Sequence, residues 1–86
     1  MTRLIRPPQP INVRCTAGGH PAHVTSHGHI RQVTAIAERW TQHALPVGAD
    51  VDCGDRVYYR VLLDGVVPWD IFRDGSGHWY LMRIIT

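Results

Sequence analysis

Turn signals punctuate this chain, in two pairs with fairly short spacing, and they constrain its fold more than any other feature. The signals are Gly18-Gly19, His27-Gly28, Asp64-Gly65 and residues 74–77. They separate short runs rich in β-branched and aromatic residues, a pattern typical of antiparallel strands joined by tight turns. The 86 residues have room for one domain. The sequence therefore predicts an all-β, single-domain small barrel, either SH3-like or a six-stranded meander.

Six runs are expected to form the strands of this barrel. They cover residues 11–16, 22–26, 30–39, 56–63, 66–73 and 78–85. The first ten residues contain three prolines, so we expect residues 1–10 to be an extended N-terminal segment with the mobility common at chain ends. The barrel domain is then expected to span residues 11–86.

Residues 29–44 carry two competing patterns. Apolar residues such as Ile30, Val33, Ile36 and Trp40 recur at three- and four-residue spacing, which favours a helix. The first three of these are β-branched, which favours a strand, and no strong N-cap precedes them. We predict a bulged or bent strand that ends near Trp40.

The clearest hairpin signal is Asp64-Gly65, because Asp-Gly suits the two central positions of a type I′ turn. A tight two-residue turn would pair Leu63 with Val66. Residues 74–77 are expected to form a second, four-residue turn. Pro68 lacks a backbone donor, so its strand is predicted to lie at an edge of the sheet or to carry a bulge. Such an edge could also pair with a second copy in a homodimer.

This register predicts two different faces for the C-terminal hairpins. One face is apolar and is expected to form the core, with Asp70 and Arg83 near enough for an ion pair. The other face mixes aromatic rings with arginine and is either a half-buried second layer or an exposed recognition surface. The residues predicted to contact a partner or nucleic acid there are Arg56, Tyr58, Arg60, Trp69, Arg73 and Tyr80.

Four histidines within ten residues raise the question of a metal site. Imidazole and thiolate groups are zinc ligands, but this spacing is not that of a zinc finger or ribbon. His27-Gly28 is also typical of a hairpin tip. We therefore expect no cofactor, and zinc binding is the minor alternative. Its ligands would be drawn from Cys15, His20, His23, His27 and His29.

The chain shows no arrangement of nucleophile, base and orienting group, so we expect no enzymatic activity. No apolar run approaches the length of a membrane helix, and residues 1–10 lack the apolar centre of a signal peptide. We expect a cytoplasmic protein without membrane contact.

Several segments resemble a known bacterial pattern: Asp-Arg-Val-Tyr-Tyr-Arg-Val at residues 55–61, the Asp64-Gly65 turn, Asp-Ile-Phe-Arg-Asp at 70–74, and Trp-Tyr-Leu at 79–81. Over residues 11–85 the chain is similar to a small uncharacterised β-domain found beside, or fused to, proteins of the Y-family (translesion) DNA polymerase group. The resemblance implies a non-catalytic accessory module in DNA damage tolerance, with a polymerase-like protein as partner. It implies no metal-binding role for the histidines.

Three functions thus remain open from the sequence. The first is the non-catalytic interaction module, linked to translesion DNA synthesis by resemblance. The second is a barrel that binds single-stranded nucleic acid directly, with aromatic rings stacking on bases. The third is the small zinc protein.

Overall fold

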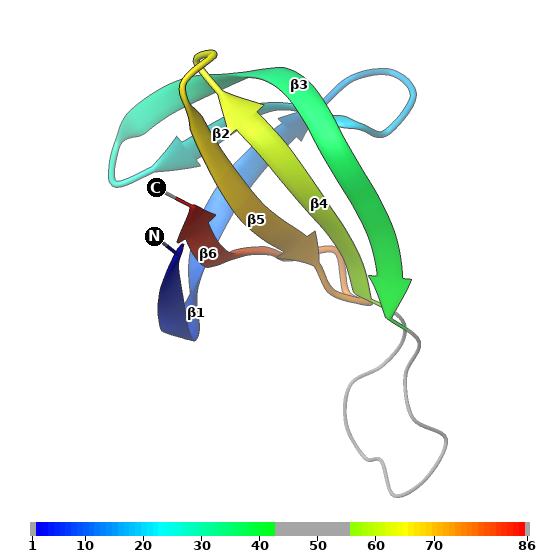
Figure 1. Cartoon of the computed structure of the whole chain (residues 1–86). Helices are drawn as coiled ribbons and strands as arrows, with labels where there is room; N and C mark the ends of the chain where they lie inside the picture. The colour runs from blue at the N-terminus through cyan, green and yellow to red at the C-terminus, as the bar shows by residue number, and fades with distance from the viewer. Residues whose placement is uncertain (1, 43–55, 86) are drawn as a thin grey trace, which may run out of the picture.

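The computed structural model describes residues 2–42 and 56–85, and within them six antiparallel strands form a closed barrel (Figure 1). Each strand pairs with the next along the chain, and the first strand pairs with the last to close the ring. Of the two architectures expected from the sequence, the six-stranded meander is the one that forms. The strands are β1 (Thr2–Cys15), β2 (Pro21–Ser26), β3 (His29–Gln42), β4 (Arg56–Leu63), β5 (Val67–Arg73) and β6 (Trp79–Ile85).

Strand β1 is longer than expected and closes the barrel. Residues 2–10, which the sequence pattern sets apart as an extended segment, are extended and form the first part of β1. This part pairs with β6, for example Thr2 with Ile85, whereas Asn12 to Cys15 pair with β2. The register along β6 shifts between Leu4 and Gln9. A strand with such an irregularity bends, so one strand reaches both neighbours.

Strand β3 confirms the prediction of a bulged strand for residues 29–44, as far as these are described. Its first residues pair with β2, and the pairing with β4 runs from Val33 to Gln42. The β4 register shifts twice, between Val33 and Ala35 and again between Ile36 and Glu38. These irregularities bend the strand across the barrel, and they also explain why its apolar residues do not alternate regularly in the sequence.

The turn at Asp64-Gly65 has the predicted type but not the predicted register. Both residues have positive φ, 54° and 72°, and the Val66 amide donates a 3.0 Å hydrogen bond to the Leu63 carbonyl. These are the features of a type I′ turn. The ladder of β4 and β5 nevertheless starts with Leu63 opposite Val67. Val66 is an extra residue, so the predicted pairing of Leu63 with Val66 is wrong for the strands.

This slip of one residue reverses the predicted faces of β5, because side chains alternate along a strand. Trp69 lies opposite Val61 and Ile71 opposite Tyr59, so both belong to the interior. Asp70, predicted for the core face, belongs to the outer face, as does Phe72. The predicted ion pair of Asp70 with Arg83 does form, but on the outside of the barrel.

The β5–β6 turn also differs from its prediction. Arg73 lies opposite Trp79, so five residues rather than four connect the strands. The Asp74 amide donates to the His78 carbonyl at 2.9 Å, and the Gly77 amide donates to the Asp74 carbonyl at 3.1 Å.

Pro68 does not mark an edge strand, because a closed barrel leaves β5 paired on both sides. Pro68 lies opposite Leu62 in β4, and the pairing with β6 begins only at the next residue, Trp69. Pro68, which has no backbone N–H, therefore lies just before the residues of β5 that pair with β6. The edge that could have paired with a second copy is absent from the described residues.

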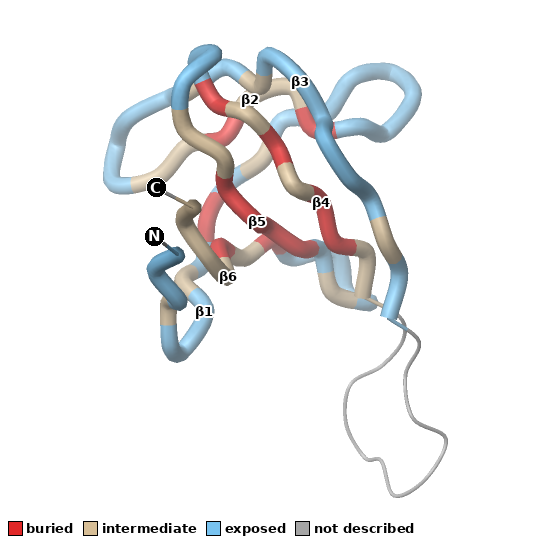
Figure 2. The backbone as a smooth tube through the Cα atoms, viewed as in Figure 1, coloured by how far each residue is buried: buried red, intermediate tan, exposed pale blue. Residues whose placement is uncertain are grey.

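The core fills the inside of the barrel. Its buried residues are concentrated on β4 and β5 (Figure 2). Val24, Val61 and Ile71 have no exposed surface, and Trp69 and Trp79 are almost completely buried in the same core. The buried core residues are Ile11, Val24, Tyr59, Val61, Leu63, Trp69, Ile71, Trp79 and Leu81.

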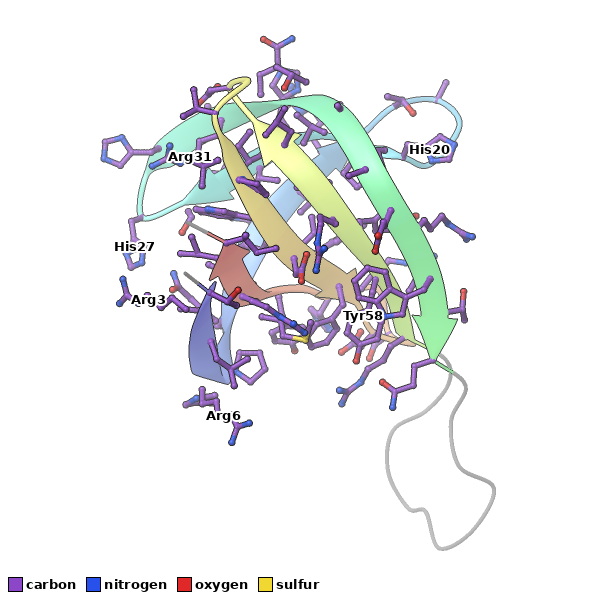
Figure 3. All side chains as sticks on the ribbon, in the orientation of Figure 1. Arg3, Arg6, His20, His27, Arg31 and Tyr58 are labelled. Atoms are coloured by element: carbon purple, nitrogen blue, oxygen red, sulfur yellow. The ribbon has the colours of Figure 1, made fainter. Side chains whose placement is uncertain are left out.

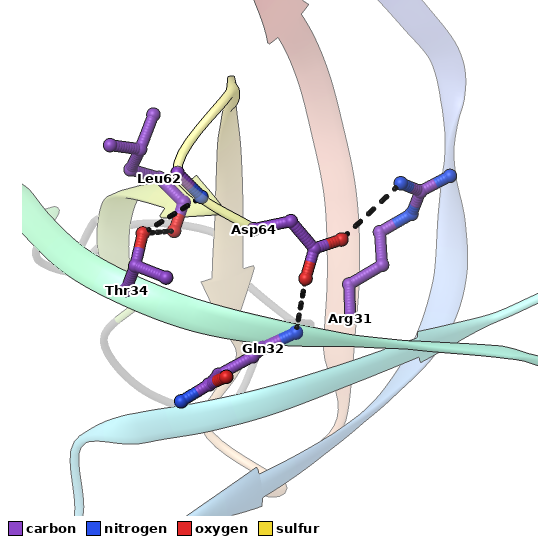
Figure 4. Close-up of polar contacts among 6 residues, drawn as sticks. Arg31, Gln32, Thr34, Leu62 and Asp64 are labelled. Atoms are coloured by element: carbon purple, nitrogen blue, oxygen red, sulfur yellow. Dashed lines mark hydrogen bonds and ion pairs between the residues drawn. The ribbon is translucent and has the colours of Figure 1, made fainter.

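Polar contacts fasten the β4–β5 turn to β3 (Figure 4). Asp64 accepts a 3.1 Å hydrogen bond from the Gln32 amide through Oδ1, and its own amide donates to the Gln32 carbonyl at 2.8 Å. The Thr34 hydroxyl donates to the Leu62 carbonyl and accepts from the Gly65 amide, both at 3.1 Å. The Thr34 hydroxyl at the first β3 irregularity thus satisfies backbone groups of the turn, and Asp64 satisfies those of Gln32.

Candidate functional site

Four aromatic rings cross the outer face of the barrel in one row, which we call the outer aromatic row. It consists of Trp40, Tyr58, Phe72 and Tyr80, on the successive strands β3 to β6. Neighbouring ring centroids are 5.3, 5.1 and 5.2 Å apart, within the range of stacked and tilted aromatic pairs. The row arises because each residue lies opposite the next in register.

The middle of the row is buried and its ends are partly exposed. Tyr58 and Phe72 are 6% and 4% exposed, whereas Trp40 and Tyr80 are half-buried. The Tyr58 hydroxyl donates a 2.8 Å hydrogen bond to Gln42 Oε1, so its polar end is satisfied. Tyr58 lies on the face of the barrel that is turned toward the viewer in Figure 3. The rings therefore form a rigid strip on the outside of the sheet.

A row of charges lies beside the rings: Glu38, Arg60, Asp70 and Arg83, again on β3 to β6. Asp70 is fully buried and receives two hydrogen bonds from Arg60, at 2.8 and 3.1 Å. Arg83 Nε lies 3.2 Å from Asp70 Oδ2, close enough for an ion pair but not aligned as a hydrogen bond. The hydrogen bond to Asp70 raises the pKa of Arg60, so Arg60 stays charged.

Other arginines lie over aromatic rings. The guanidinium of Arg56 is 5.0 Å from the centre of Phe72, which places a cation on the outer aromatic row. Arg73 and Arg39 lie 5.9 and 5.8 Å from the rings of Trp79 and Tyr59, which contact each other in the interior. These two arginines therefore cover one end of the barrel core.

The six residues predicted to form one contact surface lie in different environments. Trp69 is interior and 7% exposed, so its assignment to that face is wrong. Arg60 is bound to Asp70, and Tyr58 is buried within the row. Arg56 and Tyr80 lie at the outer row, and Arg73 is exposed beside Trp79. The sequence pattern missed Trp40 and Phe72, because their place depends on the pairing of β3 with β4 and on the one-residue slip in β5.

The four histidines do not gather at one point, although His27 and His29 both belong to the β2–β3 hairpin. His27 is at the tip of the β2–β3 hairpin with φ of 53°, as expected for a turn, whereas His20 is exposed in the loop before β2. His23 is half-buried in β2 opposite Arg14. Cys15 is an exposed free thiol. Among residues 2–42 and 56–85, no three His, Cys, Asp or Glu side chains are grouped to hold a metal ion.

No family model, curated protein or solved structure matches this chain. The similarity to the polymerase-associated domain therefore stays a prediction.

Residues 2–42 and 56–85 contain no helix that is long and apolar enough to cross a membrane.

Proposed function

We propose that the protein is a non-catalytic interaction module that binds a protein partner through the outer aromatic row. The observation that carries the proposal is the row itself: four rings in register across four strands, partly exposed at Trp40 and Tyr80. Aromatic residues and arginine dominate the binding energy of many protein interfaces. Arg56, which lies over Phe72, adds a cation to this strip.

The contacts around the outer aromatic row hold its rings in one conformation, so a partner would bind a surface that is already ordered. Tyr58 and Phe72 are held on both sides by other rings, and the Tyr58 hydroxyl is bound to Gln42. A side chain that is already ordered loses little conformational entropy when a partner binds. Trp40 and Tyr80 are each stacked on one of these fixed rings and can therefore act as anchors at a low entropic cost.

The identity of the partner belongs to the proposal and is supported by the sequence resemblance alone. It suggests a Y-family polymerase-like protein, in a cytoplasmic DNA damage tolerance pathway. The aromatic strip is compatible with such a protein partner because it presents apolar rings together with cationic groups.

The test measures binding of the full chain to a purified Y-family DNA polymerase. Trp40→Ala combined with Tyr80→Ala should weaken binding by at least about a hundredfold, if each ring contributes as a hot spot of roughly 2 kcal/mol. Val66→Ser is the matched control, because Val66 is 73% exposed in the β4–β5 turn, outside the row. Thermal unfolding of each variant verifies that it is folded.

Equal affinity of a folded double variant and the wild type would overturn the role of the row. Absence of binding by the wild-type chain would remove the polymerase from the proposal.

A second candidate function, binding of single-stranded nucleic acid, is favoured by the exposed Arg73 and by Arg56 close to the aromatic rings. Bases stack on such rings while arginines contact phosphates. Fluorescence anisotropy with a single-stranded oligonucleotide should then show affinity that falls steeply with salt. Arg73→Gln should reduce the slope of log K against log salt by about one. Affinity that does not change with salt would exclude this candidate.

A further inference from the structure

A pocket of about 260 Å³ opens at the side of the barrel where the N-terminal half of β1 meets the β2–β3 hairpin. Four basic side chains line it: Arg3, His27, His29 and Arg31. Arg3, His27 and Arg31 lie along one side of the molecule, away from Tyr58 (Figure 3). None of the lining residues, all within the described part of the chain, is acidic. The lining therefore presents positive charge, and the acid that pairs with it, Asp64 beside Arg31, lies outside the lining.

The inner wall of this pocket is apolar. It is formed by core residues, chiefly Trp69, Leu81 and Ile84, at the point where the barrel interior reaches the surface. Binding sites for small molecules commonly combine an apolar wall with a few polar groups that orient the ligand. The pocket volume, about 260 Å³, is just below the usual lower limit of about 300 Å³ for ligand sites and so suits a ligand with a single ring.

The fold itself brings the basic groups together. Arg3 lies opposite Ile84 of β6, and His29 lies opposite Ser26 across the β2–β3 turn. The Gln9 amide Nε2 is 3.3 Å from the Ser26 hydroxyl and 2.6 Å from His27 Nε2. These contacts tie the hairpin tip to β1. Residues about 25 positions apart in the sequence thus form a wall of defined shape.

The two arginines are available for an anion. Arg3 is exposed and makes no ion pair within the described residues. Arg31 lies 5.5 Å from the centre of the Trp69 ring, and its nearest acid, Asp64, is 3.8 Å away (Figure 4). Both partners of that ion pair are exposed, 41% and 51%, so water screens it and an incoming anion can compete.

We propose that this pocket binds a small organic phosphate monoester with a one-ring body. The phosphate would lie between Arg3 and Arg31, whose planar guanidinium groups match phosphate oxygens in a bidentate way. A phosphate dianion suits a wall with two arginines better than a singly charged anion does. The ring would contact Leu81 and Ile84. This site is separate from the outer aromatic row, so its failure would leave the proposed function intact.

Phenyl phosphate is the probe, titrated into the full ¹⁵N-labelled chain and followed by NMR. The chain has three tryptophans, and only Trp69 lines the pocket. Its indole N–H signal should therefore shift to saturation, with a Kd below about 1 mM, while those of Trp40 and Trp79 remain in place. Inorganic phosphate and benzyl alcohol test the anion and the ring alone, and each should bind at least about tenfold more weakly.

Arg3→Gln combined with Arg31→Gln should weaken phenyl phosphate by at least about tenfold, because charge-assisted hydrogen bonds are lost. Arg6→Gln combined with Arg14→Gln is the matched control: it also removes two charges, from exposed β1 residues outside the pocket lining, and should leave the affinity unchanged. Unsaturable shifts, shifts centred on another tryptophan, or equal affinity for benzyl alcohol would each overturn the proposal. The comparison with benzyl alcohol uses the wild-type chain and does not depend on the folding of any variant.

Discussion

Arg60 and Asp70 lie directly opposite each other on β4 and β5, and Arg60 donates hydrogen bonds to both carboxylate oxygens, at 2.8 and 3.1 Å. Arg83 approaches the same carboxylate from β6 at 3.2 Å. Asp70 is fully buried, although its side chain is on the outer face. Two cations on one buried carboxylate link three neighbouring strands, and this places the charge row among the contacts that hold the sheet together.

We expect Asp70→Asn to reduce the free energy of unfolding by roughly 2 kcal/mol, because it removes the counterion of two arginines. The cost stays below that of a fully buried pair, since Arg60 and Arg83 are 32% and 35% exposed and water partly solvates them. Urea denaturation measures the change. The exposed Asp64 offers a control, for which Asp64→Asn should cost less than about 1 kcal/mol. Equal costs for both variants would contradict this account.

Trp69 provides a test of the β5 register. Because its ring is 7% exposed and belongs to the core, Trp69→Ala should cost about 3–5 kcal/mol, a large part of the stability of a small domain. Under the register predicted from the two-residue turn, the ring would lie on the outer face and its loss would cost far less. The midpoint of thermal unfolding distinguishes the two. Val66→Ala, at the exposed extra residue, should change stability by less than about 0.5 kcal/mol.

The contribution of the Tyr58–Gln42 hydrogen bond to stability can be measured with a double-mutant cycle. Tyr58→Phe keeps the ring in the outer aromatic row and removes only the 2.8 Å bond, so it should cost about 1 kcal/mol. Once Tyr58→Phe is present, Gln42→Ala should have a smaller effect than in the wild type, with a coupling energy of about 1 kcal/mol. Additive effects in chemical denaturation would show that the bond contributes nothing.

Asp74 should make the stability of the barrel depend on pH in acid. Burial raises the pKa of Asp74, but backbone hydrogen bonds from His78 and Ser76 lower it by more, so the pKa lies below its ordinary value. A depressed pKa means that the charged form stabilises the fold above the unfolded-state pKa, about 4, and that this contribution is lost as pH falls through the folded-state value.

The variant Asp74→Asn tests this dependence. It should melt at a lower temperature than the wild type near neutral pH, and the difference should shrink as the pH falls below about 4. Thermal unfolding of both proteins across this range is the measurement. A difference in melting temperature that stays constant from neutral pH into strong acid would contradict the role of the carboxylate.

Much of the secondary structure could be predicted because it depends on local chemistry. The Asp64-Gly65 and His27-Gly28 pairs adopt positive φ at both positions, as these residue types allow, and strands follow on either side of each turn. The β-branched start of β3 was also sufficient to favour a strand over a helix. Strand β4 runs over the same residues, 56–63, that the sequence pattern indicates.

The candidate sites were harder to predict, since each depends on which residues lie opposite one another. Val66 has no local feature that marks it as an extra residue, yet it moves Trp69 into the core and Phe72 to the outside. The basic pocket has no signal in the sequence either, because Arg3 and Arg31 line one pocket only when β1 closes the barrel beside the β2–β3 hairpin.

The sequence by itself determined that this chain forms short antiparallel strands joined by tight turns, because φ preferences and side-chain branching act within a few residues. Only the tertiary structure decided which face of each strand became the interior. That choice follows from strand register, which is settled by the burial of Trp69, Ile71 and Leu81 together, and by the pairing of Asp70 with arginines from two other strands. Both are contacts between segments distant in the sequence, and their energy is realised only when the barrel closes.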